Sequence, residues 1–147
     1  MKKRYSLFLM FATAMLFVSC NDEWETEQFE QVVSFKANPN SQGVTSCYIR
    51  YNAEGKLRYN LPVIVSGSTA NEKNRTIHIG LDTDTLARLN QEQNGHRQEL
   101  YFRQLENKYY TMPETIQVPA GASTVTLPID FSLGDLDESD KWVLPLQ

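Results

Sequence analysis

Segments in which apolar and polar residues alternate recur from about residue 30 to the end of the chain, and this pattern limits the possible fold most. A period of two places every second side chain on the same face of a β-strand. The clearest runs have apolar residues at Leu57, Tyr59, Leu61, Val63 and Val65, and at Val125, Leu127, Ile129 and Phe131. Further strand-like segments cover 33–37, 47–51, 77–81, 100–105, 109–112, 115–118 and 142–146. The pattern predicts an all-β fold, an antiparallel sandwich of about eight short strands.

Three local features modify this prediction. Pro62 lies inside the longest strand, and proline lacks the N–H that a ladder needs, so an edge or a bulge is expected there. Side chains of 82–85 can cap a helix, and Leu86 and Leu89 share one helical face, which predicts one short helix between strands. Cys47 falls within a strand-like run and is interpreted as a small buried side chain.

The N-terminus has the composition of an export signal. Lys2 to Arg4 are basic, and 7–18 form an uncharged run that ends at Ser19 and Cys20. As a helix these twelve residues would span only about 18 Å, well short of the roughly 30 Å hydrocarbon core. We therefore expect 1–19 to be a lipoprotein signal peptide, and Cys20 to be the acylated residue that anchors the protein to the membrane. The alternative is an ordinary secretory signal that places Cys20 early in the mature chain by chance.

The segment 20–29 is acidic and lacks periodicity, so it is expected to be a disordered tether between the anchor and a single domain over 30–147. Asp22 and Glu23 lie two and three positions after the cysteine, and acidic residues there resemble the signal that sends Bacteroidetes lipoproteins to the cell surface. Without its signal the chain carries eleven basic and eighteen acidic residues, a formal charge of −7. This charge disfavours nucleic acid as a partner.

No catalytic, metal-binding or cofactor-binding group of residues is evident. The acidic cluster 135–140 lacks the spacing of a glycosidase or calcium motif and is interpreted as a solvated hairpin tip. His78 and His96 have no zinc-type neighbours, and the Ser66 to Ser68 turn lacks the pattern of a nucleophile elbow. We therefore expect no enzyme and no cofactor.

Aromatic residues offer a different kind of site. Sugars are held by aromatic faces with polar groups beside them, and Tyr101, Tyr110 and Trp142 are candidates for such a platform. The competing interpretation is that these side chains pack within the sandwich. Tyr109 and Tyr110 are neighbours, so a strand would point at most one of them outward.

Six motifs in order resemble the N-terminal domain of Bacteroidetes cell-surface lipoproteins known as domain of unknown function 1735. They are 63–69 (VIVSGST), 76–82 (TIHIGLD), 86–90 (LARLN), 108–113 (KYYTMP), 116–121 (IQVPAG) and 141–146 (KWVLPL). The resemblance covers about 30–147. It implies an immunoglobulin-like sandwich that follows a lipid anchor, in proteins from polysaccharide-utilisation loci.

The resemblance leaves three functions open. The first is a non-catalytic surface module in glycan capture, acting as a spacer or binding domain beside an outer-membrane glycan transporter. The second is an anchor domain of a family-18-type glycoside hydrolase, shortened at its C-terminus, because the final strand-like segment stops at Gln147. The third is a fimbrial or adhesin subunit. All three imply a lipid-anchored protein of the outer membrane that faces the medium.

Overall fold

The computed structural model describes residues 29–41, 43–48, 54–137 and 139–147. The expected signal peptide, Cys20, Asp22, Glu23 and nearly all of the tether lie outside these residues. The strands are β1 (Val32–Phe35), β2 (Lys56–Ser66), β3 (Arg75–His78), β4 (Phe102–Gln104), β5 (Tyr110–Thr111), β6 (Thr115–Val118), β7 (Thr124–Ser132) and β8 (Lys141–Val143). The helices are α2 (Thr83–Asn94) and two 3-10 turns, η3 (Gln98–Leu100) and η4 (Asn107–Tyr109). The described part contains no helix long and apolar enough to cross a membrane.

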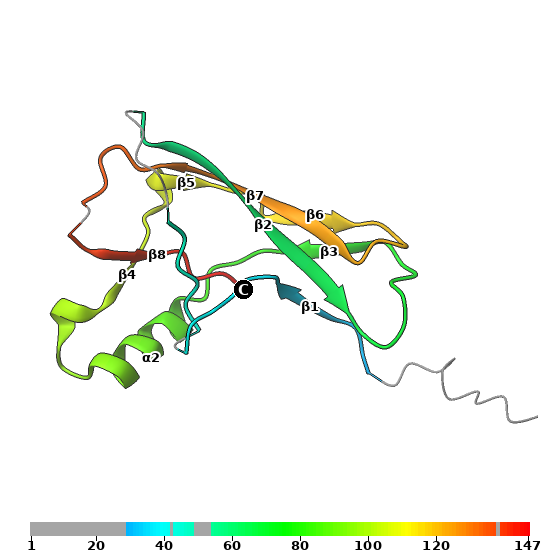
Figure 1. Ribbon diagram of the computed structural model, residues 1–147, viewed down its shortest axis with the longest axis horizontal. Helices are drawn as coiled ribbons and strands as arrows, with labels where there is room; N and C mark the ends of the chain where they lie inside the picture. Colours follow the sequence, from blue (N-terminus) through cyan, green and yellow to red (C-terminus); the bar gives the residue numbers. More distant parts are fainter. Residues whose placement is uncertain (1–28, 42, 49–53, 138) are drawn as a thin grey trace, which may run out of the picture.

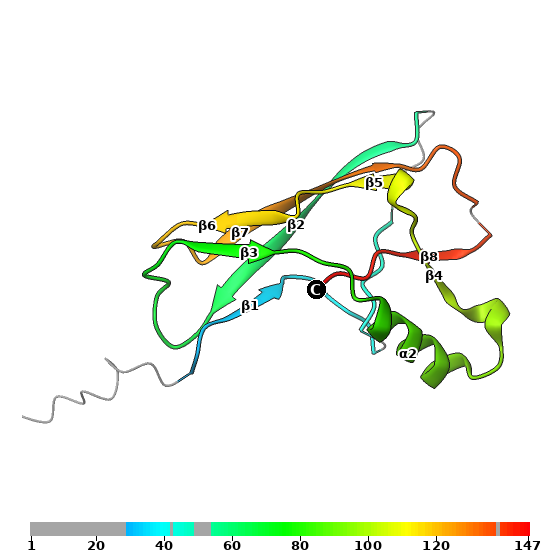
Figure 2. The same cartoon turned by 180° about the vertical axis from the view of Figure 1, so that it is seen from behind.

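The described residues fold as an all-β sandwich with one α-helix, as the alternating pattern predicts. One sheet has the strand order β1-β2-β7-β5 and is antiparallel throughout. The second layer is the antiparallel pair β3-β6 (Figures 1 and 2). A third pair, β4-β8, lies with α2 at the end of the molecule away from the point where the chain enters β1 (Figure 1).

The core lies between the two antiparallel sheets and is built from the alternating residues. Val63 of β2, Leu127 of β7 and Val118 of β6 are essentially inaccessible to solvent, with exposures of 1%, 0% and 0%. The central cluster consists of Leu61, Val63, Ile79, Ile116, Leu127 and Ile129. Burying such side chains stabilises the fold by about 1.5–3 kcal/mol each. The β2 and β7 core positions predicted from the alternation are therefore confirmed.

Pro62 lies where the β1 ladder stops. Val65 N donates to Ser123 O at 2.8 Å, so odd-numbered residues of β2 bond to β7 and even-numbered ones face β1. The edge of Pro62 that faces β1 offers only its carbonyl, which accepts from Lys36 N at 2.8 Å. β1 accordingly ends at Phe35. β2 is therefore an interior strand and not the expected edge, and Pro62 is tolerated because its missing N–H falls on the β1 side, just beyond the last residue paired with β1.

Helix α2 begins and ends at the expected signals, and it is longer than the 86–90 segment that predicted it. The Asp82 carboxylate accepts from Thr85 N at 2.9 Å, and Gly95 ends the helix with φ of 55°. Asn90 is buried, and its amide both donates to Phe102 O and accepts from Phe102 N, each at 2.8 Å. The Asn90 amide thus satisfies the backbone N–H and C=O of Phe102, as a neighbouring strand would do. These two bonds hold α2 against β4.

The C-terminal segment differs from the single antiparallel strand that we expected. β8 pairs with β4 in parallel, with Trp142 opposite Arg103. Beyond β8 the chain turns to residues 80–82, where Gln147 and Gly80 exchange both backbone hydrogen bonds at 3.0 Å. One seven-residue segment therefore joins the β4 unit to the end of the β3 segment.

The expected strand around Cys47 is wrong in its described part. Residues 44–48 adopt no strand, Cys47 is exposed, and Tyr48 is 99% exposed. Only three apolar residues of that run, Cys47, Ile49 and Tyr51, alternate, and the last two lie outside the described residues. A run this short fixes no partner strand, so its period was a weak signal.

Gly55 is expected to tolerate no side chain. Its φ is +60°, and a Cβ there would lie 2.4 Å from Gly134 N. We expect Gly55→Ala to lower the free energy of unfolding by roughly 3 kcal/mol, because backbone strain and a clash add together. Gly121→Ala is the matched control: its φ is +83° with open space around it, so only about 1–2 kcal/mol should be lost. Equal losses in urea unfolding would show that the contact with Gly134 is unimportant.

The cap of α2 should titrate. The hydrogen bond from Thr85 N holds the pKa of Asp82 below its ordinary value of about 3.9. The stabilisation is therefore complete at neutral pH and is lost as the pH falls through the lowered pKa. The Thr85 amide shift in NMR should titrate with a midpoint below the ordinary value, and Asp82→Asn should abolish the titration while α2 stays folded. A midpoint at or above about 3.9 would contradict this assignment.

Candidate functional site

Tyr101 holds the end of α2. It follows η3 directly, and its hydroxyl donates to Gly95 O and also lies 3.1 Å from Gln91 Oε1, the alternative acceptor for its single hydrogen. The side chain is half-buried. These bonds give Tyr101 a structural role at the helix C-terminus, where carbonyls lack helical partners.

Tyr110 belongs to the large sheet. It lies in β5, packs against the core, and donates its hydroxyl to Asn107 Oδ1 at 2.8 Å. Its neighbour Tyr109 is buried in η4 and donates to Asp135 O at 3.3 Å. The three aromatic residues predicted from the sequence thus come from different elements: Tyr110 from the large sheet, Trp142 from the β4-β8 pair, and Tyr101 from the junction of η3 and β4.

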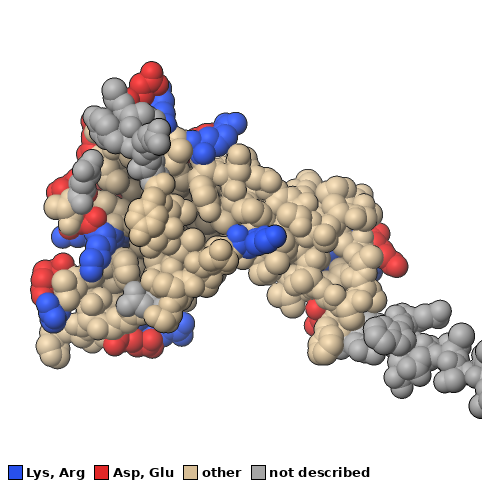
Figure 3. All heavy atoms as spheres, viewed as in Figure 1, with Lys and Arg blue, Asp and Glu red and all other residues tan. Residues whose placement is uncertain are grey.

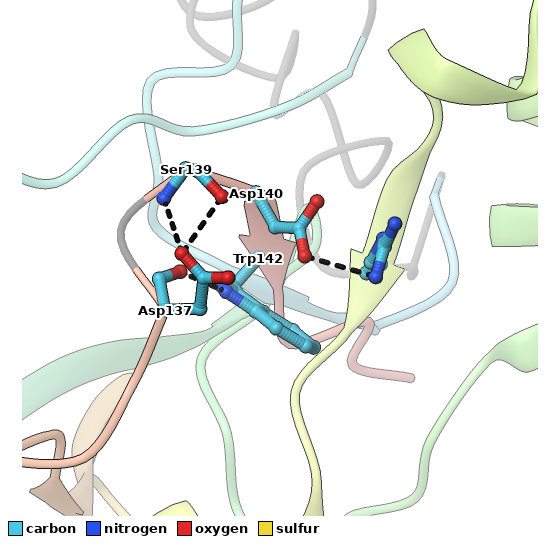
Figure 4. A network of polar contacts seen from close by, with 5 residues as sticks. Asp137, Ser139, Asp140 and Trp142 are labelled. Atoms are coloured by element: carbon cyan, nitrogen blue, oxygen red, sulfur yellow. Dashed lines mark hydrogen bonds and ion pairs between the residues drawn. The ribbon is translucent and has the colours of Figure 1, made fainter.

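Trp142 lies in a polar network on the β4-β8 pair (Figure 4). It is half-buried, and its indole Nε1 donates to Asp137 O at 2.7 Å. Arg103, opposite Trp142 in the ladder, pairs with Asp140 through Nη1 and Oδ2 at 2.9 Å. The indole therefore sits beside a charged pair that can donate and accept further hydrogen bonds.

The acidic cluster 135–140 is not a hairpin tip. It connects β7 to β8, and these two strands pair with other partners. Asp137 Oδ1 accepts from Ser139 N at 2.9 Å and from Ser139 Oγ at 2.7 Å, and these bonds lower the pKa of Asp137 (Figure 4). The Asp137 carboxylate thus fixes Ser139, which directly precedes Asp140 in the chain.

Charged side chains gather in the same region. In the view of Figure 3, basic and acidic residues concentrate at the end that holds α2, β4 and β8. Lys141 lies 5.8 Å from the ring centre of Phe102, on the face opposite that of Trp142. Among the described residues, no three His, Cys, Asp or Glu side chains are grouped so as to hold a metal ion. His78 lies exposed in β3, and His96 is exposed beyond the end of α2.

A second polar feature was missed by sequence reasoning. Arg58 of β2 and Asp130 of β7 are directly opposite, and Nε and Nη2 of the arginine each donate to one carboxylate oxygen at 2.7 Å. The pair raises the pKa of Arg58 and lowers that of Asp130. It forms part of a surface groove of about 310 Å³, lined by Lys56, Leu57, Arg58, Asp130, Phe131 and Ser132. The available signal was the outward position of Arg58 and Asp130 in two long alternating runs, but the register that joins them cannot be read from either run.

Solved structures from Bacteroides share this fold. A multidomain protein including DUF1735 from Bacteroides ovatus is 50% identical, with a TM-score of 0.76 over 79% of this chain and 40% of its own. A protein of unknown function from the same organism is 45% identical, with a TM-score of 0.73 over 86% of this chain and 38% of its own. An auxiliary nutrient binding protein from Bacteroides thetaiotaomicron is 35% identical, with a TM-score of 0.59 over 76% of this chain and 33% of its own.

These comparisons confirm the resemblance to DUF1735 proteins. The chain spans about 40% of the length of the first of these structures, and no curated protein matches it. A family model described as a domain of unknown function, DUF4973, matches residues 24–147. Since this match includes every described residue, the chain belongs to the DUF4973 family.

Proposed function

We propose that the chain is a non-catalytic module of a lipid-anchored cell-surface protein that takes part in glycan capture. The observation that carries the proposal is the 35% identity, over 76% of this chain, to an auxiliary nutrient binding protein. In this role the sandwich acts beside an outer-membrane glycan transporter, either as a spacer or by holding sugar itself.

The β4-β8 face supports a direct role in holding sugar. Sugar sites combine an aromatic surface with a few fixed polar groups. Trp142 supplies the ring, and the Arg103–Asp140 pair supplies donors and acceptors beside it. The indole is held in place by its bond to Asp137 O, so little side-chain freedom is lost when a ligand stacks on it.

The N-terminus supports the proposed location. Phe29, where the described part of the chain begins, is nine positions after Cys20. Nine residues can span at most about 30 Å, so an acyl anchor on Cys20 would keep the sandwich close to the membrane surface. Several acyl chains on Cys20 would hold it there firmly.

The anchor is tested by labelling cells that express the full chain with a palmitate analogue. The wild type should take up label and Cys20→Ala should not, because Cys20 supplies the acylated thiol. Protease added to intact cells should digest the wild type, while replacing Asp22 and Glu23 with Ala should protect the protein until lysis. Equal labelling of the wild type and Cys20→Ala would contradict the assignment of the anchor. A wild type that resists protease on intact cells would contradict surface display.

Glycan capture is tested with fluorescent polysaccharides on cells that display the full chain. Cells with the wild type should bind at least one neutral or acidic polysaccharide, and Trp142→Ala should weaken binding about tenfold by removing the stacking surface. Tyr110→Phe is the control, because it removes only the bond to Asn107. If cells with and without the protein bind every polysaccharide equally, the proposed function is wrong.

A further inference from the structure

We propose that the outer face of the four-stranded sheet carries a separate site for a neutral sugar, formed by Arg58, Asp130 and Thr111. This inference rests on the proposed function in glycan capture. The site is distinct from Trp142, which belongs to the β4-β8 pair. It would bind a pyranose ring through two neighbouring hydroxyl groups.

The three side chains form a row across adjacent strands. Asp130 of β7 is opposite Arg58 of β2 on one side and opposite Thr111 of β5 on the other. Residues directly opposite in a ladder project from the same face, about 5 Å apart. The apolar residues that alternate with Arg58 and Asp130, such as Tyr59 and Ile129, pack in the core, so the row faces outward.

The ion pair is fixed and still has unused hydrogen-bonding capacity. The guanidinium has five N–H donors, of which two donate to Asp130. Each carboxylate oxygen accepts one of these bonds and has a further lone pair. The side chains of Arg58 and Asp130 are 64% and 49% exposed, so a ligand can reach them. One sugar hydroxyl can accept from Arg58 while its neighbour donates to Asp130.

The surrounding groove suits a small sugar. Its volume of about 310 Å³ is at the lower end of the range of ligand sites, which begins near 300 Å³. Lys56 and Ser132 alternate with Leu57 and Phe131, so they share the outer face with Arg58 and Asp130 and add polar groups at the rim of the groove. Thr111 is exposed and extends the polar row by a third group.

Charge favours a neutral ligand. A carboxylate or sulfate that approached Arg58 would meet Asp130 at the same time, and a cation would meet the guanidinium. Hydroxyl groups have no net charge and use both partners. The lowered pKa of Asp130 keeps this carboxylate ionised at neutral pH, so it remains an acceptor.

The site lies on the longest strand pairing among the described residues. β2 and β7 are paired along nine successive positions, from Lys56 opposite Ser132 to Ile64 opposite Thr124. A site on paired strands keeps its geometry better than one on loops. The binding groups therefore lose little freedom when a ligand arrives.

The test uses the full lipidated chain in detergent micelles and a panel of neutral oligosaccharides, with uronic acid oligosaccharides for comparison. Arg58→Ala and Asp130→Ala should each weaken binding of a neutral oligosaccharide at least tenfold in calorimetry, and Thr111→Val should weaken it less. Arg97→Ala is the matched control, since the Arg97–Glu99 pair has similar exposure and lies beyond α2. A double variant that exchanges Arg58 and Asp130 keeps an ion pair in the ladder and shows whether lost binding reflects lost folding.

Each result decides the assignment. Loss of binding in both single variants and in the folded exchange variant, with Arg97→Ala unchanged, supports it. Undiminished binding of neutral oligosaccharides by Arg58→Ala and Asp130→Ala overturns the assignment of this site. If Trp142→Ala abolishes the same binding, the sugar is held at Trp142 and the proposed function in glycan capture still stands. Preference for uronic acid oligosaccharides, or no binding to any neutral oligosaccharide, also overturns the assignment of this site. The experiment with whole cells decides the proposed function separately.

Discussion

The antiparallel ladder between β2 and β7 is the contact on which the rest of the structure depends. It joins nine pairs of residues and places Leu61, Val63, Leu127 and Ile129 side by side on its inner face. Every other strand of the large sheet attaches to one of these two, and the β3-β6 pair covers their buried face. Because a strand alternates strictly, the same ladder also fixes which residues face solvent. Core and outer surface therefore follow from one register.

Buried amides hold the less regular parts of the fold in place. Asn90 fastens α2 to β4, and Asn71 donates to Pro119 O and Ala122 O, both at 3.0 Å, while accepting from Arg75 Nε. Both asparagines are buried, and no buried side-chain polar atom in the described ranges lacks a partner. A buried amide without these partners would cost about 1–3 kcal/mol. Such residues therefore select one arrangement of the loops.

Sequence reasoning identified the elements that rest on local pattern. The runs around Val63 and Leu127 are long enough to define their buried faces, and Asp82 and Gly95 mark the ends of the helix. It failed where pairing is decided by distant contacts. The parallel β4-β8 pair and the exposed position of Cys47 have no local signal, since each depends on which backbone lies alongside. The acidic sequence 135–140 likewise predicts a hairpin tip, because strands adjacent in sequence usually pair, whereas β7 and β8 pair with other strands.

The candidate sites also depend on contacts between residues that are distant in the sequence. Aromatic residues stand out in a sequence, but the hydroxyl bonds of Tyr101 and Tyr110 serve the fold, and only the structure sets Trp142 beside Arg103. Arg58 and Asp130 are 72 positions apart, and each alone is an ordinary surface charge. They become a fixed pair only through the ladder that also closes the core. A substitution that shifted one of these strands by one residue would turn its charge toward the core and break the pair, so a stable core and the geometry of the outer face depend on the same register.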